Sequence, residues 1–326
     1  MLKLGTVALD GTKIHANASR HSALSYEQAG KIEAQLQAEV ADLLAKAEMA
    51  DQADVPDGMS VPEELARREA RLAKLAEARA KIEARAKALF ERERAEHEAR
   101  LTERAAKTAA TGRKPGGRTP QPPLEGPQPK EQINLTDEDS RIMPVAGGGF
   151  EQCYNAQAAV AADSLLVVTH DVVQAPNDKQ QLAPMVEKLN ALPDELGKVE
   201  TLLADNGYFS AANVTACAAA AIEPLIAMGR QSHYPTLDER FAAAPPAPAP
   251  EHPTAMQTMA HRLKTPAGKK LYALRKQVPE PVFGIIKAAL GFRQFLLRGL
   301  ERVRGEWSLV TMAWNLKRLF TLCPAV

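Results

Sequence analysis

Residues 199–209 read VETLLADNGYF, and residues 5–13 read GTVALDGTK. Each stretch is a short apolar run that ends on an aspartate, Asp205 in the first and Asp10 in the second. A run of this length and composition is typical of a buried strand. Because the carboxyl ends of strands in α/β sheets face the functional crevice, the two aspartates are the first candidates for a site.

The sequence around these runs alternates between strand-like and helix-like patterns. Strands are predicted over 3–10, 154–161, 165–173, 199–204 and 222–227, and helices over 178–192, 210–221, 268–300 and 306–321. Such an alternation indicates an α/β core. Asn155 and Gln157, two residues apart on one predicted strand, are expected to make structural hydrogen bonds. Asp178 is expected to cap the helix over 178–192, and the alternative is a position beside a catalytic site.

A long charged segment interrupts this core. Residues 27–110 hold 18 acidic and 15 basic residues and a single aromatic residue. Leu65, Leu72, Leu75, Ile82, Ala86 and Leu89 follow alternating spacings of seven and three or four, with a break near 55–58. This pattern predicts a coiled-coil-like helical hairpin. A solvated helical spacer explains the pattern as well as a dimer seam does.

The predicted division of the chain follows from these patterns. Residues 1–26 carry the first core strand and Asp10, residues 27–110 form the helical insertion, and residues 111–149 form a Pro/Gly-rich linker and lead-in. Residues 150–326 complete the core, with an Ala/Pro loop near 240–255.

The overall charge hides a local imbalance. The 326 residues carry a formal net charge of only +1, and 25% of them are charged, which excludes a natively disordered chain. Residues 261–304, however, hold eleven Lys and Arg against two acidic residues, Glu280 and Glu301. A segment with that excess can neutralise phosphates. No apolar run has the length of a membrane span, and three cysteines without paired spacing indicate neither a zinc site nor a disulfide framework.

A third carboxylate lies in the basic segment. Glu280 is at or near the start of a helix in YALRKQVPEPVFGIIK, residues 272–287. Three converging carboxylates suit oxygen-coordinated Mg²⁺, and two such ions can support phosphoryl transfer. Spacing alone does not establish this, because an aspartate at a strand end is often only part of a turn.

Six stretches together resemble the DDE transposases of bacterial insertion sequences. They are VALDGTKIHANAS, LTDEDSRIM, YNAQAAV, LLADNGYFS, YALRKQVPEPVFGIIK and the closing GFRQFLLRGLERVRGEWSLVTMAWNLKRL. They are most similar to the branch with a long charged helical insertion after the first aspartate. The resemblance implies a ribonuclease H-like core and metal-dependent DNA cleavage and strand transfer, with Mg²⁺ or Mn²⁺, two ions, as cofactor.

The same resemblance implies partners and a location. The partners are double-stranded DNA at the transposon's terminal repeats and target DNA, bound by a homodimer, with no membrane involved. The location is the bacterial cytoplasm, at the nucleoid when the protein is bound to DNA.

The family's catalytic and metal-binding residues match Asp10, Asp205 and Glu280 in this sequence. Its tyrosine, arginine and lysine positions around the glutamate match Tyr272, Arg275 and Lys287, which the resemblance assigns to DNA binding.

Lys13 follows the first aspartate closely and is a further candidate for a phosphate contact. For the basic side chains the ordinary alternative is a solvated position, and for Tyr272 it is a packed one.

Two departures from the family pattern have consequences. Pro279 stands where the branch usually has valine, and a helix that ran through it would kink beside Glu280. The family usually carries a helical domain before the first aspartate, and Asp10 is almost at the start of this chain. The alternative to an active enzyme is therefore a catalytically inactive, truncated remnant that binds DNA only.

Overall fold

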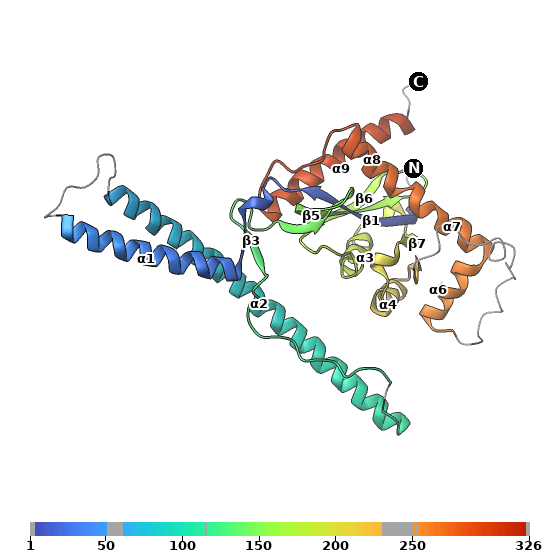
Figure 1. Ribbon diagram of the computed structural model, residues 1–326. Coiled ribbons are helices and arrows are strands. Elements are labelled where there is room, and N and C mark those ends of the chain that lie inside the picture. Colours follow the sequence, from blue (N-terminus) through green and yellow to red (C-terminus); the bar gives the residue numbers. More distant parts are fainter. Residues whose placement is uncertain (1–3, 51–60, 115, 230–250, 252, 324–326) are drawn as a thin grey trace. The chain divides into compact units, whose positions relative to one another are not determined.

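The computed structural model describes residues 4–50, 61–114, 116–229, 251 and 253–323 (Figure 1). They divide into two compact units, one made of Met1–Arg20 with Asp139–Val326 and the other of His21–Glu138. The predicted break at 55–58 and most of the Ala/Pro loop near 240–255 lie outside the described residues.

The first unit is built on a mixed six-stranded sheet. Its strands are β1 (Gly5–His15), β4 (Arg141–Pro144), β5 (Phe150–Ala161), β6 (Val167–Val173), β7 (Val199–Ala204) and β8 (Glu223–Ile226). The order is β4-β5-β1-β7-β8, with β6 pairing β5. β1, β7 and β8 run parallel to one another. β5 pairs antiparallel with β1, with β4 and with β6. The predicted α/β class is thereby confirmed.

Helices cover both faces of the sheet (Figure 1). On one face, α3 (Leu182–Asn190), α4 (Ala211–Ala219) and α6 (Ala255–Lys264) pack against Val7 and Leu9 of β1. On the other, α7 (Pro266–Gln277), α8 (Pro279–Ala288) and α9 (Leu300–Leu322) pack against Ala8 and Ile14. The alternation of side chains along β1 divides the core into these two halves. Short 3-10 turns occur at Arg20–Ser22, Asp194–Leu196 and Asn206–Tyr208.

The predicted helix over 268–300 is divided in two and also ends too late, because residues 289–299 contain no helix. α7 ends at Gln277 and α8 begins at Pro279, so the proline occupies the first turn of a new helix. Proline has no N–H to donate within a helix, and the first turn is where that loss costs least. Glu280 is therefore the second residue of α8, as predicted for a helix start, and no kinked helix runs past it.

Two tryptophans join α9 to the sheet. Trp307 is fully buried and Trp314 nearly so, and their indole N–H groups donate to the carbonyl oxygens of Gln157 and Leu165 at 3.1 and 2.8 Å. Both lie on α9, which therefore contacts the sheet through apolar area and through directed hydrogen bonds, among them those of Asn315 with the backbone of Val167. Phe295 is also fully buried, in edge contact with Tyr154.

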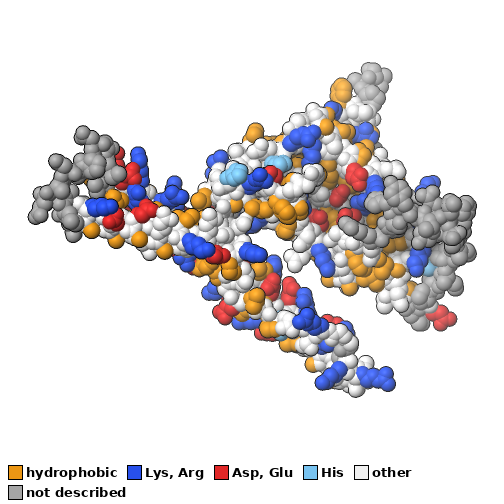
Figure 2. Space-filling model, in the orientation of Figure 1, with side chains coloured by type: hydrophobic (Ala, Val, Ile, Leu, Met, Phe, Trp, Pro, Cys, Tyr) orange, Lys and Arg blue, Asp and Glu red, His pale blue; other side chains and the backbone are white. Residues whose placement is uncertain are grey.

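The second unit consists of two long helices and a small sheet. The helices are α1 (Tyr26–Ala50) and α2 (Val61–Thr111), and β2 (Ala23–Ser25) pairs with β3 (Gln132–Asn134). Side chains of both charge signs follow the helices on the face shown in Figure 2. Residues 116–131 contain neither helix nor strand, whereas β3 and β4 lie in the rest of the range predicted as linker and lead-in.

The apolar seam of α2 packs against other segments of the same unit. Leu75 packs with Ala29 and Leu36 of α1, and Ile82 packs with Ile133. Leu89, at the end of the predicted seam, is 39% exposed. The first half of α2 thus has an intramolecular partner, and between residues 87 and 111 no side chain of α2 is fully buried.

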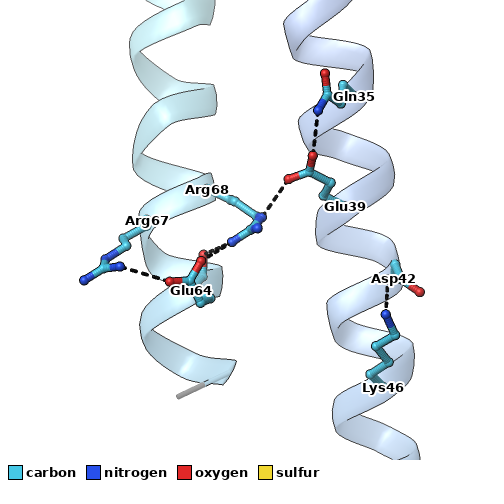
Figure 3. A network of polar contacts seen from close by, with 7 residues as sticks. All are labelled: Gln35, Glu39, Asp42, Lys46, Glu64, Arg67 and Arg68. Carbon is cyan, nitrogen blue, oxygen red and sulfur yellow. Dashed lines mark hydrogen bonds and ion pairs between the residues drawn. The ribbon is translucent and has the colours of Figure 1, made fainter. Parts of the chain in front are cut away.

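The arginines that interrupt this seam are paired with acidic residues. Arg68 pairs with two glutamates (Figure 3). Its Nε lies 2.9 Å from Glu39 of α1, and its Nη1 binds Glu64, which accepts a further bond from Arg67. Arg79 binds Glu33 and lies over the ring of Tyr26. Exposed pairs of this kind contribute little each, so they set which helix faces meet while the apolar seam stabilises the contact.

Among the described residues, no helix combines the length and the apolar character needed to cross a membrane.

Candidate catalytic carboxylate site

Asp10 and Asp205 lie at neighbouring positions on adjacent parallel strands. The last residue pair between β1 and β7 is Ala8 with Leu203, and each aspartate follows its strand's member of that pair by two residues. β7 ends at Ala204, one residue before Asp205, whereas β1 continues beside β5 to His15. Asp10 therefore lies within its strand, and the predicted strand end at Asp10 is wrong. The structure thus brings together two of the three carboxylates that the sequence singled out.

Asp10 is in an unfavourable place for a negative charge. Burial raises its pKa to about 7, and the charges of Asp205 and Asp178 raise it as well. The Gly11 N–H, which donates to Asp10 Oδ1 at 2.8 Å, and the guanidinium of Arg275 lower it. Near neutral pH this carboxyl is therefore divided between its two protonation states, and a cation bound there would favour the charged one.

Asp205 is fixed by the turn that follows it. It is the N-cap of the short helix Asn206–Tyr208, and its Oδ1 accepts the Gly207 N–H at 2.7 Å. A side chain on Gly207 would begin 2.9 Å from that same oxygen, so glycine keeps the approach open. The Asn-Gly turn seen in the sequence is therefore part of what orients this carboxylate.

Glu280 is connected to the pair through an arginine. Its Oε1 lies 3.6 Å from a terminal nitrogen of Arg275, the same guanidinium that lowers the pKa of Asp10. The side chain of Glu280 is 53% exposed, whereas that of Arg275 is 13% exposed. In the part of the chain that is described, no three His, Cys, Asp or Glu side chains are grouped closely enough to hold a metal ion.

Lys287 connects α8 to β1. Its Nζ donates to Thr12 Oγ1 at 2.5 Å and to the carbonyl oxygen of Lys13 at 3.1 Å. Burial lowers the pKa of Lys287, and the charges of Arg293 and Lys13 lower it further. This lysine is thus partly occupied by contacts within the protein.

Lys13 lies on the α3 side of the sheet, 3.9 Å from Asp178 Oδ1. Its side chain is 18% exposed, and burial lowers its pKa. Tyr272, on α7, donates from its hydroxyl to the carbonyl oxygen of Ala204 at 3.4 Å. Tyr272 therefore packs beside the end of β7, one residue before Asp205.

A buried polar cluster behind Asp10 has more members than the sequence indicated. Asp178 does not cap α3, whose N-cap is Gln181. Its Oδ1 instead accepts bonds from the side-chain amides of Asn155 and Gln157, each at 2.7 Å. The structural role expected for the two amides is confirmed, whereas the cap expected of Asp178 is wrong. Tyr208 belongs to the same cluster, and only its place in the LLADNGYF run could have indicated it.

A comparison with protein families completes this description. Residues 249–320 match a family model described as Transposase DDE domain. The matched segment spans α6 to α9 and carries Glu280 with the basic residues around it, while Asp10 and Asp205 lie outside it. A search of curated proteins gives no match. Over residues 249–320 this chain is thus similar to the DDE domain of transposases, which supports the resemblance seen in the sequence.

Proposed function

We propose that this protein is an insertion-sequence transposase that cleaves DNA phosphodiester bonds and transfers the freed strand, with Asp10, Asp205 and Glu280 as its catalytic carboxylates. The observation that supports the proposal is the register of β1 and β7, in which Asp10 and Asp205 each follow the pair Ala8–Leu203 by two residues. The family match supplies independent support for Glu280, since it covers the segment in which this residue lies. The sheet order and the flanking helices are consistent with a ribonuclease H-like core.

The residues present fit divalent metal ions of the Mg²⁺ or Mn²⁺ type. Such ions prefer carboxylate oxygens, and Asp10 within β1 and Asp205 just after β7 could supply them from two neighbouring strands. Negative charges on other carboxylates help to raise the pKa of Asp10. A bound cation would offset this repulsion. A pair of ions at such a site would activate the attacking oxygen and stabilise the leaving one.

Glu280 is proposed to complete this site after it leaves Arg275. Its exposed carboxylate is at the start of α8, and its only contact described is the 3.6 Å pair with Arg275. Freed from that pair, Arg275 would be available to a DNA phosphate, the role that the resemblance gives it. One side-chain rearrangement would thus serve both residues.

The DNA is proposed to lie along the basic segment 261–304, which contains eleven Lys and Arg and two acidic residues. Arg275, whose charge lowers the pKa of Asp10, is a candidate for a phosphate contact together with Lys287 and Lys13. Tyr272, which lies beside the end of β7, is a further candidate for DNA binding. The substrates would be the terminal repeats of the element and a target duplex, bound by two copies of the chain. Such a protein would act in the bacterial cytoplasm, at the nucleoid.

The test is a cleavage assay on DNA that carries the terminal repeats, with purified protein and Mg²⁺. The wild-type protein is expected to nick the repeat ends, and Asp205→Asn is expected to bind the DNA without nicking it. Asp171→Asn is the matched control. Asp171 is on β6, which does not pair with β1 or β7, and its carboxylate pairs with Lys188 of α3 and Arg304 of α9. Equal nicking by wild type and Asp205→Asn would exclude the proposed role of Asp205.

A further inference from the structure

A chain of buried hydrogen bonds connects the turn of Asp205 to the centre of the sheet. Tyr208, three residues after Asp205, donates from its hydroxyl to Gln157 Oε1 on β5. Gln157 Nε2 donates in turn to Asp178 Oδ1 at 2.7 Å, and Asn155 donates to the same oxygen. Tyr208, Gln157 and Asn155 are all completely buried.

Gln157 is held from both faces of the sheet. Its side chain binds Tyr208 and Asp178 on the α3 face, while its backbone carbonyl accepts the indole N–H of Trp307 from α9. It is also paired across the strands with Gly11, the residue after Asp10. Gln157 therefore provides a fixed point beside both candidate aspartates.

Gly11 shows how closely this network approaches β1. A Cβ atom at this position would lie 2.3 Å from Gln157 Nε2 and 2.7 Å from Asp178 Oδ1. Both distances are too short for any side chain, so glycine is required for the network to pack against the strand that carries Asp10. The requirement is steric and does not concern the backbone angles.

A second connection holds the other end of the turn. Asn213 of α4 donates from its side-chain amide to the carbonyl oxygens of Tyr208 and Lys179, at 2.6 and 2.7 Å. The segment around Asp178 and the turn of Asp205 are thereby joined twice, through Gln157 and through Asn213. Buried polar groups of this kind are costly unless satisfied, and together they specify one arrangement.

From these contacts we propose that Tyr208 and Gln157 are positioning residues that hold Asp205 in the orientation needed to bind a divalent cation with Asp10. This inference rests on the proposed function, because it assigns Asp205 to a cation site. Neither residue is expected to contact the cation or DNA, since both are buried beneath the turn. Outer partners that orient metal-binding carboxylates typically change metal affinity by about 10-fold to 100-fold when they are removed.

The test compares two tyrosine variants of the full chain in a titration with Mn²⁺ alone. The electron paramagnetic resonance spectrum of the free ion measures how much Mn²⁺ is unbound. Tyr208→Phe removes the hydroxyl that binds Gln157 and keeps the ring. Tyr154→Phe is the matched control, because Tyr154 is equally buried but faces the opposite side of the sheet. Tyr208→Phe is expected to weaken Mn²⁺ binding about tenfold or more, and Tyr154→Phe to change it less than twofold.

A second readout follows the turn directly. Gly207 donates its N–H to Asp205 Oδ1, so hydrogen exchange at this amide reports whether the carboxylate is held. Exchange is expected to be faster in Tyr208→Phe and unchanged in Tyr154→Phe. If Tyr208→Phe does not fold, the double variant Tyr208→Phe/Gln157→Leu, which removes both partners, is judged by the same two readouts.

The outcomes separate this inference from the proposed function. Wild-type Mn²⁺ affinity in Tyr208→Phe, or equal weakening in both tyrosine variants, would overturn the positioning role. Asp205→Asn is titrated alongside and is expected to lose most of the binding. If Asp205→Asn binds Mn²⁺ like wild type, the cation site itself is excluded, and with it the proposed function.

Discussion

Asp10 and Asp205 occupy equivalent positions on two adjacent parallel strands, each two residues beyond the pair Ala8–Leu203. This relationship places two carboxylates side by side although 195 positions separate them in the sequence. Burial is the main cause of the raised pKa of Asp10, and the charge of Asp205 raises it further. The chemistry of the site and the stability of the fold are therefore connected through this pair.

The first prediction concerns stability and pH. Because the pKa of Asp10 is about 7 in the folded protein and close to 4 in the unfolded chain, the folded state holds a proton that the unfolded state has lost. Metal-free protein is thus expected to lose stability as the pH rises from about 4 to about 7 through this group. Asp10→Asn should remove that loss and exceed the wild type by roughly 2–4 kcal/mol at pH 8.

Urea unfolding of both proteins in a chelator, at pH 5 and pH 8, measures this difference. The advantage of Asp10→Asn is expected to be smaller at pH 5, where most of Asp10 is protonated in the folded state. An identical pH dependence in the two proteins would mean that Asp10 is not the titrating group.

The second prediction concerns Arg275. Its guanidinium lowers the pKa of Asp10 and pairs with Glu280, so Arg275→Gln is expected to shift the Asp10 pKa to higher pH. Carbon-detected NMR of the aspartate side chains measures the shift. Lys276→Gln is the control, since Lys276 is the exposed neighbour on the same helix. A titration unchanged by Arg275→Gln would contradict the placement of this arginine beside the pair.

The third prediction separates two roles of Lys287. Its bonds to Thr12 and to the Lys13 carbonyl connect α8 with β1, so Lys287→Met is expected to cost about 1–2 kcal/mol of folding stability. If the same lysine also reaches a phosphate, the slope of log affinity against log salt should fall by about 0.9. Urea unfolding and salt titrations of DNA binding check the two effects. Stability and slope that both match the wild type would remove Lys287 from either role.

The fourth prediction concerns the helical unit. Leu75 is 3% exposed in the contact between α1 and α2, whereas Leu89 on the same helix is 39% exposed. Leu75→Ala is expected to destabilise this unit by about 2–4 kcal/mol, and Leu89→Ala by less than about 1 kcal/mol. Proteolysis or hydrogen exchange over α1 and α2 would show the difference. Equal effects would mean that the seam is not the main contact between the helices.

Much of the sheet could be predicted because its strands are buried and bounded by clear signals. The strand at 199–204 is found as predicted, since a continuous apolar run ends there on an aspartate and a turn. The sequence places Glu280 at or near a helix start, as found, but it does not predict the break after Gln277. A helical composition on both sides of Val278 conceals the point at which proline interrupts the hydrogen bonding.

The polar cluster could not be derived in the same way. Asp178 resembles a helix cap in sequence, since it precedes a helix and is preceded by asparagine, and only the folded sheet brings Asn155 and Gln157 to it. Tyr208 likewise reads as a core aromatic residue, and its hydroxyl acquires a function only through contact with β5. Partners distant in sequence are set by strand register, which a single sequence does not contain.

The most direct measurement of the central claim is the anomalous diffraction of crystals of the full chain grown with Mn²⁺ and DNA. A peak between the carboxylates of Asp10 and Asp205, with Glu280 turned from Arg275 toward it, is the predicted result. A peak elsewhere, with Asp10 and Asp205 making no metal contact, would contradict the assignment of this pair as the catalytic centre.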